Sequence, residues 1–459
     1  KLQRERDERA ALINSLKIVD APMRAASLYL SILDIPRRRS LWLEAIWRSD
    51  ATADDLQLLI IYYSKPTERM EIVRQLQEVS PHAPLAVMTL LEYDTEYVKN
   101  NLDQCEKEFH DCIPVLGSLG RVFFAQKNYA NAQKYLTRYL EYSPDLEVYT
   151  MLADTYMQQG DEAGWLKTLN EYLTREDRGL GHARVQSSIA HHFGKKGEWE
   201  KALPYGEAAA ATGSGWGMDC ARYCNEGAGN WEQAEEWQKN ISERYEDSGF
   251  DWFFWCRRTG HGNIKSARAF ARDRLANIAR SGGSAQEQLC VGIFLLLEKD
   301  RTGAKKAFED SLRIGTEPLG WLQFAVMADE DGETKLRDKA LKQTAALSRM
   351  ADGYEKNRRA SYFHLAERTL ECLDKDSFEK LDDRFIEELI KNGRPGDEPN
   401  IAYLAGRFLE LHGQKKRGEA LLMRAAEYDE KPRRSQVLAH WLLKSRKIEV
   451  TVGIVGPLD

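Results

Sequence analysis

Thiol and imidazole side chains are the groups in this sequence best suited to binding metals or to nucleophilic chemistry. Cys220 and Cys224 are four residues apart, which places them on one face of a helix, and Cys256 follows later. No CxxC or CxxxH spacing of the kind used for zinc accompanies them. His191 and His192 do not form a His-Glu-x-x-His arrangement either. We therefore predict no metal site, no catalytic residue and no enzymatic activity.

Two glycine-containing stretches resemble phosphate-binding motifs in part. Gly213, Gly215 and Gly217 are spaced as GxGxG before a predicted helix, but no strand precedes them, as a dinucleotide-binding turn requires. The final GIVGPLD lacks the Lys-Ser/Thr pair of a phosphate loop. We expect no cofactor.

Composition indicates a folded protein in an aqueous compartment. The 459 residues are 42% hydrophobic and 30% charged, and a net charge of -6 provides no general attraction to nucleic acid or anionic membranes. The short basic runs Arg37–Arg39 and Lys444–Lys447 are typical of solvated helix ends. Seven scattered cysteines predict free thiols in a reducing compartment, so we expect a cytoplasmic location.

Membrane insertion of this segment is not expected, because no window approaches eighteen consecutive apolar residues. The charged opening at Lys1 would also suit a position just after an anchor or a signal, so an upstream anchor stays open as an alternative.

The clearest structural pattern runs from 112 to 144. Apolar residues recur every three or four positions in both halves, which places them on one face of each of two helices: Leu116, Leu119, Gly120 and Phe123, then Ala132, Leu136 and Tyr139. A polar turn at Lys127 and Asn128 separates the halves, and Pro144 cannot continue the second helix. The stretch therefore predicts a hairpin of two helices.

This pattern resembles the tetratricopeptide repeat, in which Leu-Gly, an aromatic residue, a later Ala and a closing Pro recur about every 34 residues. Equivalent turn positions follow at Ala202, Ala234, Ala267 and Ala304, at spacings of 32, 33 and 37 residues. The resemblance is clearest over 112–314 and 400–430. It implies an all-α fold, a right-handed α-solenoid (superhelix) of antiparallel helical hairpins.

Four segments are expected along this solenoid. Residues 1–110 are predicted to be degenerate helical hairpins that cap it, with helices near 20–33, 38–49, 52–64, 67–79, 84–93 and 95–109. Core repeats follow over 111–318, and C-terminal helical repeats with a cap over 319–447. Residues 448–459 are a strand-like tail that would open a further segment.

The resemblance also implies a binding surface, because the first helices of stacked hairpins line the concave face. Carried over residue by residue, it gives Arg121, Phe124, Asp154, Arg184, His191, Lys195, Arg222, Asn225 and Trp252 as the partner-binding set. The basic members suit an anionic ligand or a C-terminal carboxylate, through hydrogen bonds of about 1.5–3 kcal/mol each. The alternative is an ordinary solvated helix face. The Lys/Asn carboxylate clamp of chaperone-binding members is not reproduced, because Asp154 interrupts it.

The most unusual local composition is the aromatic cluster Phe250, Trp252, Phe253, Phe254 and Trp255, followed by Cys256-Arg257-Arg258. Trp and Arg are enriched at binding hot spots. Four aromatic residues within five helical positions cannot share one face, however, so at least two are predicted to lie in the core.

These observations predict a non-enzymatic scaffold for protein–protein interaction, which holds an extended peptide or a helix of a partner in its concave groove. Self-association through the ridges is a further expectation. The alternative is a sensor or substrate-presenting repeat domain of a larger multidomain enzyme or membrane-anchored complex. Nucleic-acid binding is not expected, because Arg121, Asp154, His191 and Arg222 lack the regularity of repeats that read one base each.

Overall fold

The computed structural model describes residues 66–175, 179–245, 249–314, 318–350, 353–394, 396–428 and 434–450, with residues 53, 56 and 60 before them. These residues form 22 helices and no strand, so the all-α prediction is confirmed. The predicted helices at 20–33 and 38–49, most of 52–64 and the basic run Arg37–Arg39 lie outside the described residues. Residues 448–450 have no regular secondary structure, and the rest of the tail also lies outside.

The chain divides into two compact units, Lys1–Glu176 and Asp177–Asp459. The segment boundaries predicted at 110/111 and 318/319 do not coincide with this division and stay predictions.

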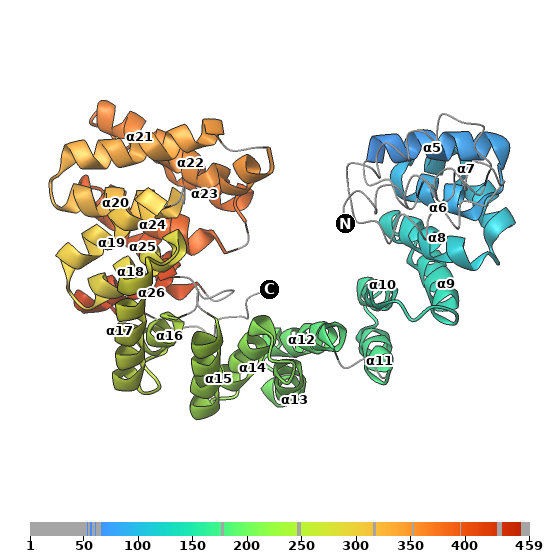
Figure 1. The fold of residues 1–459 in the computed structure, drawn as a ribbon, viewed down its shortest axis with the longest axis horizontal. Coiled ribbons are helices and arrows are strands. Elements are labelled where there is room, and N and C mark those ends of the chain that lie inside the picture. The colour runs from blue at the N-terminus through green and yellow to red at the C-terminus, as the bar shows by residue number, and fades with distance from the viewer. Residues whose placement is uncertain are drawn as a thin grey trace, which may run out of the picture. The chain divides into compact units, whose positions relative to one another are not determined.

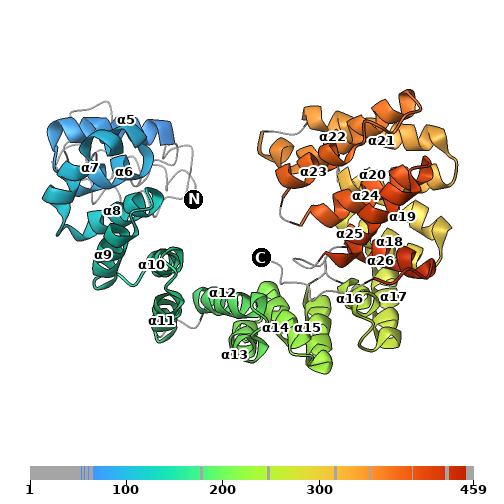
Figure 2. The ribbon, with the colours of Figure 1, turned by 180° about the vertical axis from the view of Figure 1, so that it is seen from behind.

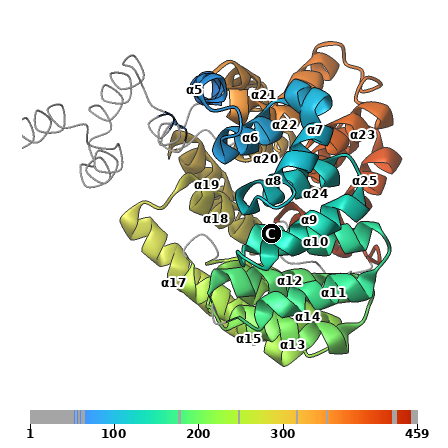
Figure 3. The same cartoon turned by 90° about the vertical axis from the view of Figure 1, so that its right-hand side faces the viewer.

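Unit 1 is a row of helical hairpins (Figures 1 and 3). Its helices are α5 (Pro66–Val79), α6 (Pro84–Tyr93), α7 (Thr95–Phe109), α8 (Ile113–Ala125), α9 (Tyr129–Leu140), α10 (Leu146–Gln158) and α11 (Glu162–Leu173). The helices predicted near 67–79, 84–93 and 95–109 are confirmed. Side-chain caps begin several of them: Asp94 accepts from the backbone N–H groups of Glu96 and Tyr97, and Asp161 from that of Gly164.

The hairpin of α8 and α9 has the features that its sequence predicts. Lys127 has a φ of 61°, a left-handed conformation that turns the chain between the two helices. Gly120 lies so close to Leu136 that a Cβ atom would overlap its side chain. The helices therefore approach closely at the glycine, whose nearest neighbour is the side chain of Leu136.

Unit 2 begins with five further hairpins and ends with five helices that fold back on them. The hairpins are α12 (Leu180–Lys195) with α13 (Trp199–Ala210), α14 (Gly215–Gly227) with α15 (Trp231–Arg244), α16 (Asp251–Thr259) with α17 (Ile264–Ser281), α18 (Ala285–Leu297) with α19 (Arg301–Ile314), and α20 (Pro318–Glu330) with α21 (Thr334–Met350). The last helices are α22 (Gly353–Asp374), α23 (Asp383–Asn392), α24 (Glu398–Leu411), α25 (Lys415–Glu427) and α26 (Arg434–Ser445).

The C-terminal helices cover the first helices of the later hairpins. Helix α24 packs against α20, and α26 packs against α16, α18 and α24. Figures 1 and 2 show α24–α26 alongside α18–α20 from both sides. Residues 322–328 of α20 and 399–409 of α24 are buried without a break, as expected of helices surrounded by protein. One apolar core therefore runs from α15 to α26.

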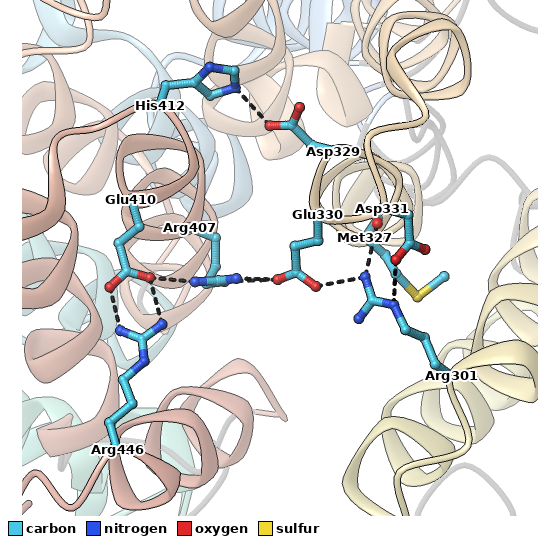
Figure 4. Close-up of polar contacts among 9 residues, drawn as sticks. All are labelled: Arg301, Met327, Asp329, Glu330, Asp331, Arg407, Glu410, His412 and Arg446. Carbon is cyan, nitrogen blue, oxygen red and sulfur yellow. Dashed lines mark hydrogen bonds and ion pairs between the residues drawn. The ribbon is translucent and has the colours of Figure 1, made fainter.

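We call this packing of α24 and α26 on α16, α18 and α20 the closure of unit 2. Ion pairs between charged side chains connect its helices (Figure 4). Arg407 of α24 reaches across to Glu330 of α20 and also pairs with Glu410. Glu330 in turn pairs with Arg301 of α19 at 2.9 Å, and Arg446 pairs with Glu410. Arg301, Glu330, Arg407, Glu410 and Arg446 thus form a chain of alternating charge, which we call the ion ladder. Beside it, Nε2 of His412 lies 2.8 Å from a carboxylate oxygen of Asp329.

Candidate functional site

An open groove of about 670 Å³ lies on unit 1 between α6, α7 and α8. Its apolar lining consists of Leu91, Val98, Leu102, Val122 and Ala125, and its polar lining of Glu92, Thr95, Lys99, Asn100, Asp103 and Gln126. Its volume lies within the range of ligand-binding pockets, and its lining combines apolar side chains with polar ones. We call it the α7 groove.

The distribution of buried and half-buried apolar residues along α7 explains why the groove exists. Cys105 and Phe109 bury the C-terminal half of α7 in the core. In the N-terminal half, Val98 and Leu102 are only half-buried and lie one turn apart on the face that lines the groove. Helix α7 therefore presents an apolar stripe that α8 does not cover.

A polar network fixes the edge of the groove. Nη1 of Arg121 lies 2.9 Å from Oε1 of Glu92, and its Nη2 lies 3.6 Å from Glu147 at the start of α10. Ser118 donates a hydrogen bond of 3.2 Å to Glu92. Arg121, which is 34% exposed, thus bridges α6, α8 and α10 instead of presenting an unpaired cation.

None of the three predicted site residues of unit 1 is part of the groove lining, although Arg121 pairs with the lining residue Glu92. Phe124 is half-buried, with its ring edge-on to Tyr129 of α9 at 5.8 Å between centroids. Asp154 is exposed on α10. The structure therefore brings only Arg121 to the groove edge.

Three predicted site residues lie on α12 of unit 2. Arg184 and Lys195 are exposed, and His191 is half-buried, with its ring stacked on Tyr223 of α14 at 5.6 Å. These positions leave Arg184 and Lys195 accessible, while His191 packs between two hairpins.

The prediction that Arg222 faces an open groove is wrong, because its side chain is 0% exposed. Its Nε donates to Asp219 at 2.8 Å, and its Nη1 donates to Glu226. Arg258 and Trp255 of α16 donate to the same carboxylate, at 3.0 and 2.6 Å. Burial alone would raise the pKa of Glu226, but Arg222 and Arg258 lower it, so its carboxylate stays ionised. The cation is compensated within the protein and is not available to a ligand.

Asn225 and Trp252 are also buried, so their predicted place on an open groove is wrong. Asn225 donates to Glu207 of α13 at 2.5 Å and to the carbonyl of Ala221. The indole nitrogen of Trp252 donates to Glu235 of α15 at 2.9 Å. Each polar group therefore joins neighbouring helices of unit 2.

The aromatic cluster lies in the core. All five rings, Phe250, Trp252, Phe253, Phe254 and Trp255, are buried, which confirms that at least two pack internally. Phe253, for example, stacks edge-on against Phe294 of α18 at 4.9 Å. Because Phe294 lies 41 residues after Phe253, the local spacing of the sequence does not predict this contact.

Three observations on the described residues concern metal binding and membrane insertion. No group of three or more His, Cys, Asp or Glu side chains in the described ranges is arranged to hold a metal ion. A hydrogen bond with Cys220 and burial raise the pKa of the Cys224 thiol, which disfavours the thiolate that binds metals. Among the same residues, no helix combines the length and apolar character needed to cross a bilayer.

The model of the tetratricopeptide repeat family matches residues 113–146, the hairpin of α8 and α9. The resemblance inferred from the sequence is confirmed there. No curated protein matches the chain.

Several solved structures are similar at low identity. The crystal structure of the APC/C heterotetramer Cut9-Hcn1 is 13% identical, with a TM-score of 0.29 over 81% of this chain and 76% of that chain. Naa15/Naa10 bound to HypK-THB is 14% identical, with a TM-score of 0.37 over 86% and 60%. Yeast Tom70 is 13% identical, with a TM-score of 0.22 over 74% and 90%. At these identities and TM-scores, the similarity gives no information about a partner or an activity of this chain.

Proposed function

We propose that this chain is a non-catalytic scaffold for protein–protein interaction and that the α7 groove of unit 1 receives a segment of a partner protein. The observation that carries the proposal is the groove itself, with Val98 and Leu102 half-exposed in its floor. Helical-repeat folds of the tetratricopeptide type generally serve as interaction scaffolds, and the groove adjoins the matched repeat at α8.

The groove has the two components that a selective interaction needs. Covering its apolar floor would gain about 25 cal/mol for each Å² removed from water. Lys99, Asn100, Asp103 and Gln126 around the floor would add specificity through hydrogen bonds and charge. Because Glu92 is held by Ser118 and Arg121, this edge needs little further ordering when a partner binds.

The residues of the predicted set that are not buried keep a secondary role in this proposal. Arg121 acts by holding the groove edge, and Phe124 and Asp154 lie on neighbouring surfaces of unit 1. Arg184 and Lys195, with His191 beside them, form a separate basic surface on α12 of unit 2. An anionic ligand is proposed only for that surface.

Affinity capture from the native source tests the groove, with the chain carrying Val98→Asp and Leu102→Asp compared with the wild type. We expect one or more partners to be lost from the variant. The matched control carries Leu180→Asp and Ile314→Asp, which change two exposed apolar residues outside the groove and should retain those partners. An identical set of captured proteins for all three chains, each with unchanged helical circular dichroism, would refute the proposal.

A further inference from the structure

The walls of the α7 groove are ridges of two helices. On α7 the lining residues Thr95, Val98 and Leu102 follow one another at steps of three and four. At the C-terminal end of α8, the lining residues Ala125 and Gln126 lie three and four positions after Val122. Side chains with this spacing form ridges on a helix surface, and another helix packs its own ridges into the grooves between them. The shape of the groove therefore matches a helix, over the roughly 12 Å that Thr95 to Asp103 span along α7.

The backbone of the groove walls favours a helix over an extended peptide. The lining residues Val98 to Asp103 lie inside α7, so their backbone N–H groups are used within the helix. An extended peptide that adds to a sheet edge pairs with a continuous row of unpaired backbone groups, which a helical wall of this kind does not offer. A helix satisfies its own backbone and needs only a surface for its apolar stripe.

Two charges on α7 indicate where such a helix would carry complementary charges. Lys99 and Asp103 are exposed and lie one turn apart on the groove lining. Within the described ranges, neither forms an ion pair with another residue. A partner would therefore gain from an acidic side chain opposite Lys99 and a basic side chain one turn along, opposite Asp103.

We infer, on the basis of the proposed function, that the occupant of the α7 groove is an amphipathic helix of a partner protein. Its apolar stripe has the spacing i, i+3 or i+4, and i+7, and covers Leu91, Val98, Leu102 and Val122. An acidic and a basic residue, one turn apart, flank the stripe and face Lys99 and Asp103.

Selection from a phage-displayed library of random 16-residue peptides on the full chain tests this inference. We expect enriched peptides to show the helical apolar spacing, and a proline placed at their centre to weaken binding at least tenfold. Val98→Asp with Leu102→Asp should also weaken binding at least tenfold, while the control with Leu180→Asp and Ile314→Asp should not. Exchanging the charges, by Lys99→Asp with Asp103→Lys, should favour peptides with the opposite charge order.

The outcomes separate the inference from the proposed function. Enriched peptides that need Val98 and Leu102 but tolerate the proline overturn the helical occupant and leave the groove as a binding site. An absence of enriched peptides, or peptides insensitive to the changes at Val98 and Leu102, overturns both. A dimer of the chain that these changes dissociate, measured by sedimentation, would replace the partner helix with a second copy.

Discussion

At the scale of single residues, Glu226 shows how unit 2 accommodates buried charge. Its carboxylate accepts hydrogen bonds from Arg222, Arg258 and Trp255, and all four side chains are buried. Removing one partner from such a cluster leaves charges that neither water nor protein compensates.

Glu226→Gln should therefore destabilise the protein by about 3–5 kcal/mol, because two buried guanidinium groups lose their shared carboxylate. Urea unfolding followed by circular dichroism measures the change. Glu236→Gln on the exposed face of α15 is the control, with an expected effect below about 0.5 kcal/mol. Equal unfolding midpoints for the two variants would show that the cluster contributes no net stability.

His440 of α26 gives unit 2 a dependence on pH. Burial lowers the pKa of His440, and the nearby charges of Lys444 and Arg258 lower it further. As pH falls below about 6.5, the unfolded chain therefore binds a proton at this position before the folded chain does. The contribution of His440 to stability is present above that pH and is lost as the pH falls toward the lower folded pKa.

We expect the free energy of unfolding to decrease between pH 7 and pH 5, and His440→Gln to reduce the steepness of that decrease. Urea titrations of the wild type and the variant at several pH values measure it. The same slope in both chains would exclude His440 as a source.

Two glycines in successive first helices allow a matched comparison. A Cβ atom at Gly292 of α18 would overlap the ring of Phe308, whereas at Gly320 of α20 the nearest atom is Oγ of Ser311, at 3.4 Å. Gly292→Ala should therefore cost about 1–3 kcal/mol through overpacking. Gly320→Ala should be neutral or stabilising by up to about 1 kcal/mol, since alanine favours helices. Thermal unfolding of both variants measures the two changes in stability. Equal losses of stability would contradict the difference in packing between Gly292 and Gly320.

At the scale of elements, the hairpins were predictable and their long-range packing was not. The apolar spacing around Gly120 and Ala132 indicates which faces of α8 and α9 are buried, because those faces meet within one hairpin. The same kind of spacing in α24 indicates only that the helix is buried. Arg407 of α24 pairs with Glu330, which lies 77 residues earlier in the sequence. A local sequence pattern cannot predict a contact over that separation.

The sequence pattern did not predict the α7 groove for a related reason. Val98 and Leu102 lie one turn apart and each is followed by a charged residue, a signal present in the sequence. This stretch lacks the repeat consensus on which the predicted site residues depend, so the resemblance assigns no site there. Conversely, Arg222 occupies a slot that faces outward in the family, but Arg258, 36 residues later, helps to enclose the carboxylate that it binds.

A substitution in the ion ladder tests how much the contact between α20 and α24 contributes to stability. Arg407 is 8% exposed and is the link between Glu330 and Glu410. Arg407→Met should destabilise unit 2 by about 1–3 kcal/mol, because Glu330 loses its partner across the closure. Faster amide hydrogen exchange in α24 and α26 would locate the effect.

Arg384 provides the control for this experiment. It is 88% exposed and pairs with Glu388 on its own helix, α23. Arg384→Met should leave amide exchange in α24 and α26 unchanged, with an effect on stability below about 0.5 kcal/mol. Unchanged exchange in both variants would mean that apolar packing alone holds the closure.

At the scale of the whole molecule, the division into two compact units predicts that unit 2 folds without unit 1. Its apolar core from α15 to α26 lies entirely within residues 177–459. A fragment of these residues should unfold cooperatively in urea, with a midpoint close to that of the same helices in the full chain.

Shortening this fragment to residues 177–433 provides the comparison, because it removes α26 from its place against α16 and α18. The shorter fragment should lose much of its cooperativity and expose apolar surface that binds a hydrophobic dye. If both fragments unfold alike, α26 is not part of the core of unit 2.

The closure in unit 2 has a consequence for how this part of the chain can evolve. A row of hairpins that is open at its end can gain or lose a repeat by duplication or deletion, because each hairpin contacts only its neighbours. In unit 2, a hairpin inserted between α17 and α18 would separate α16 from α18, and α26 could no longer touch both. The number of hairpins between α16 and α26 is therefore fixed by the geometry of closure, and inherited variation in repeat number should be confined to the rest of the chain.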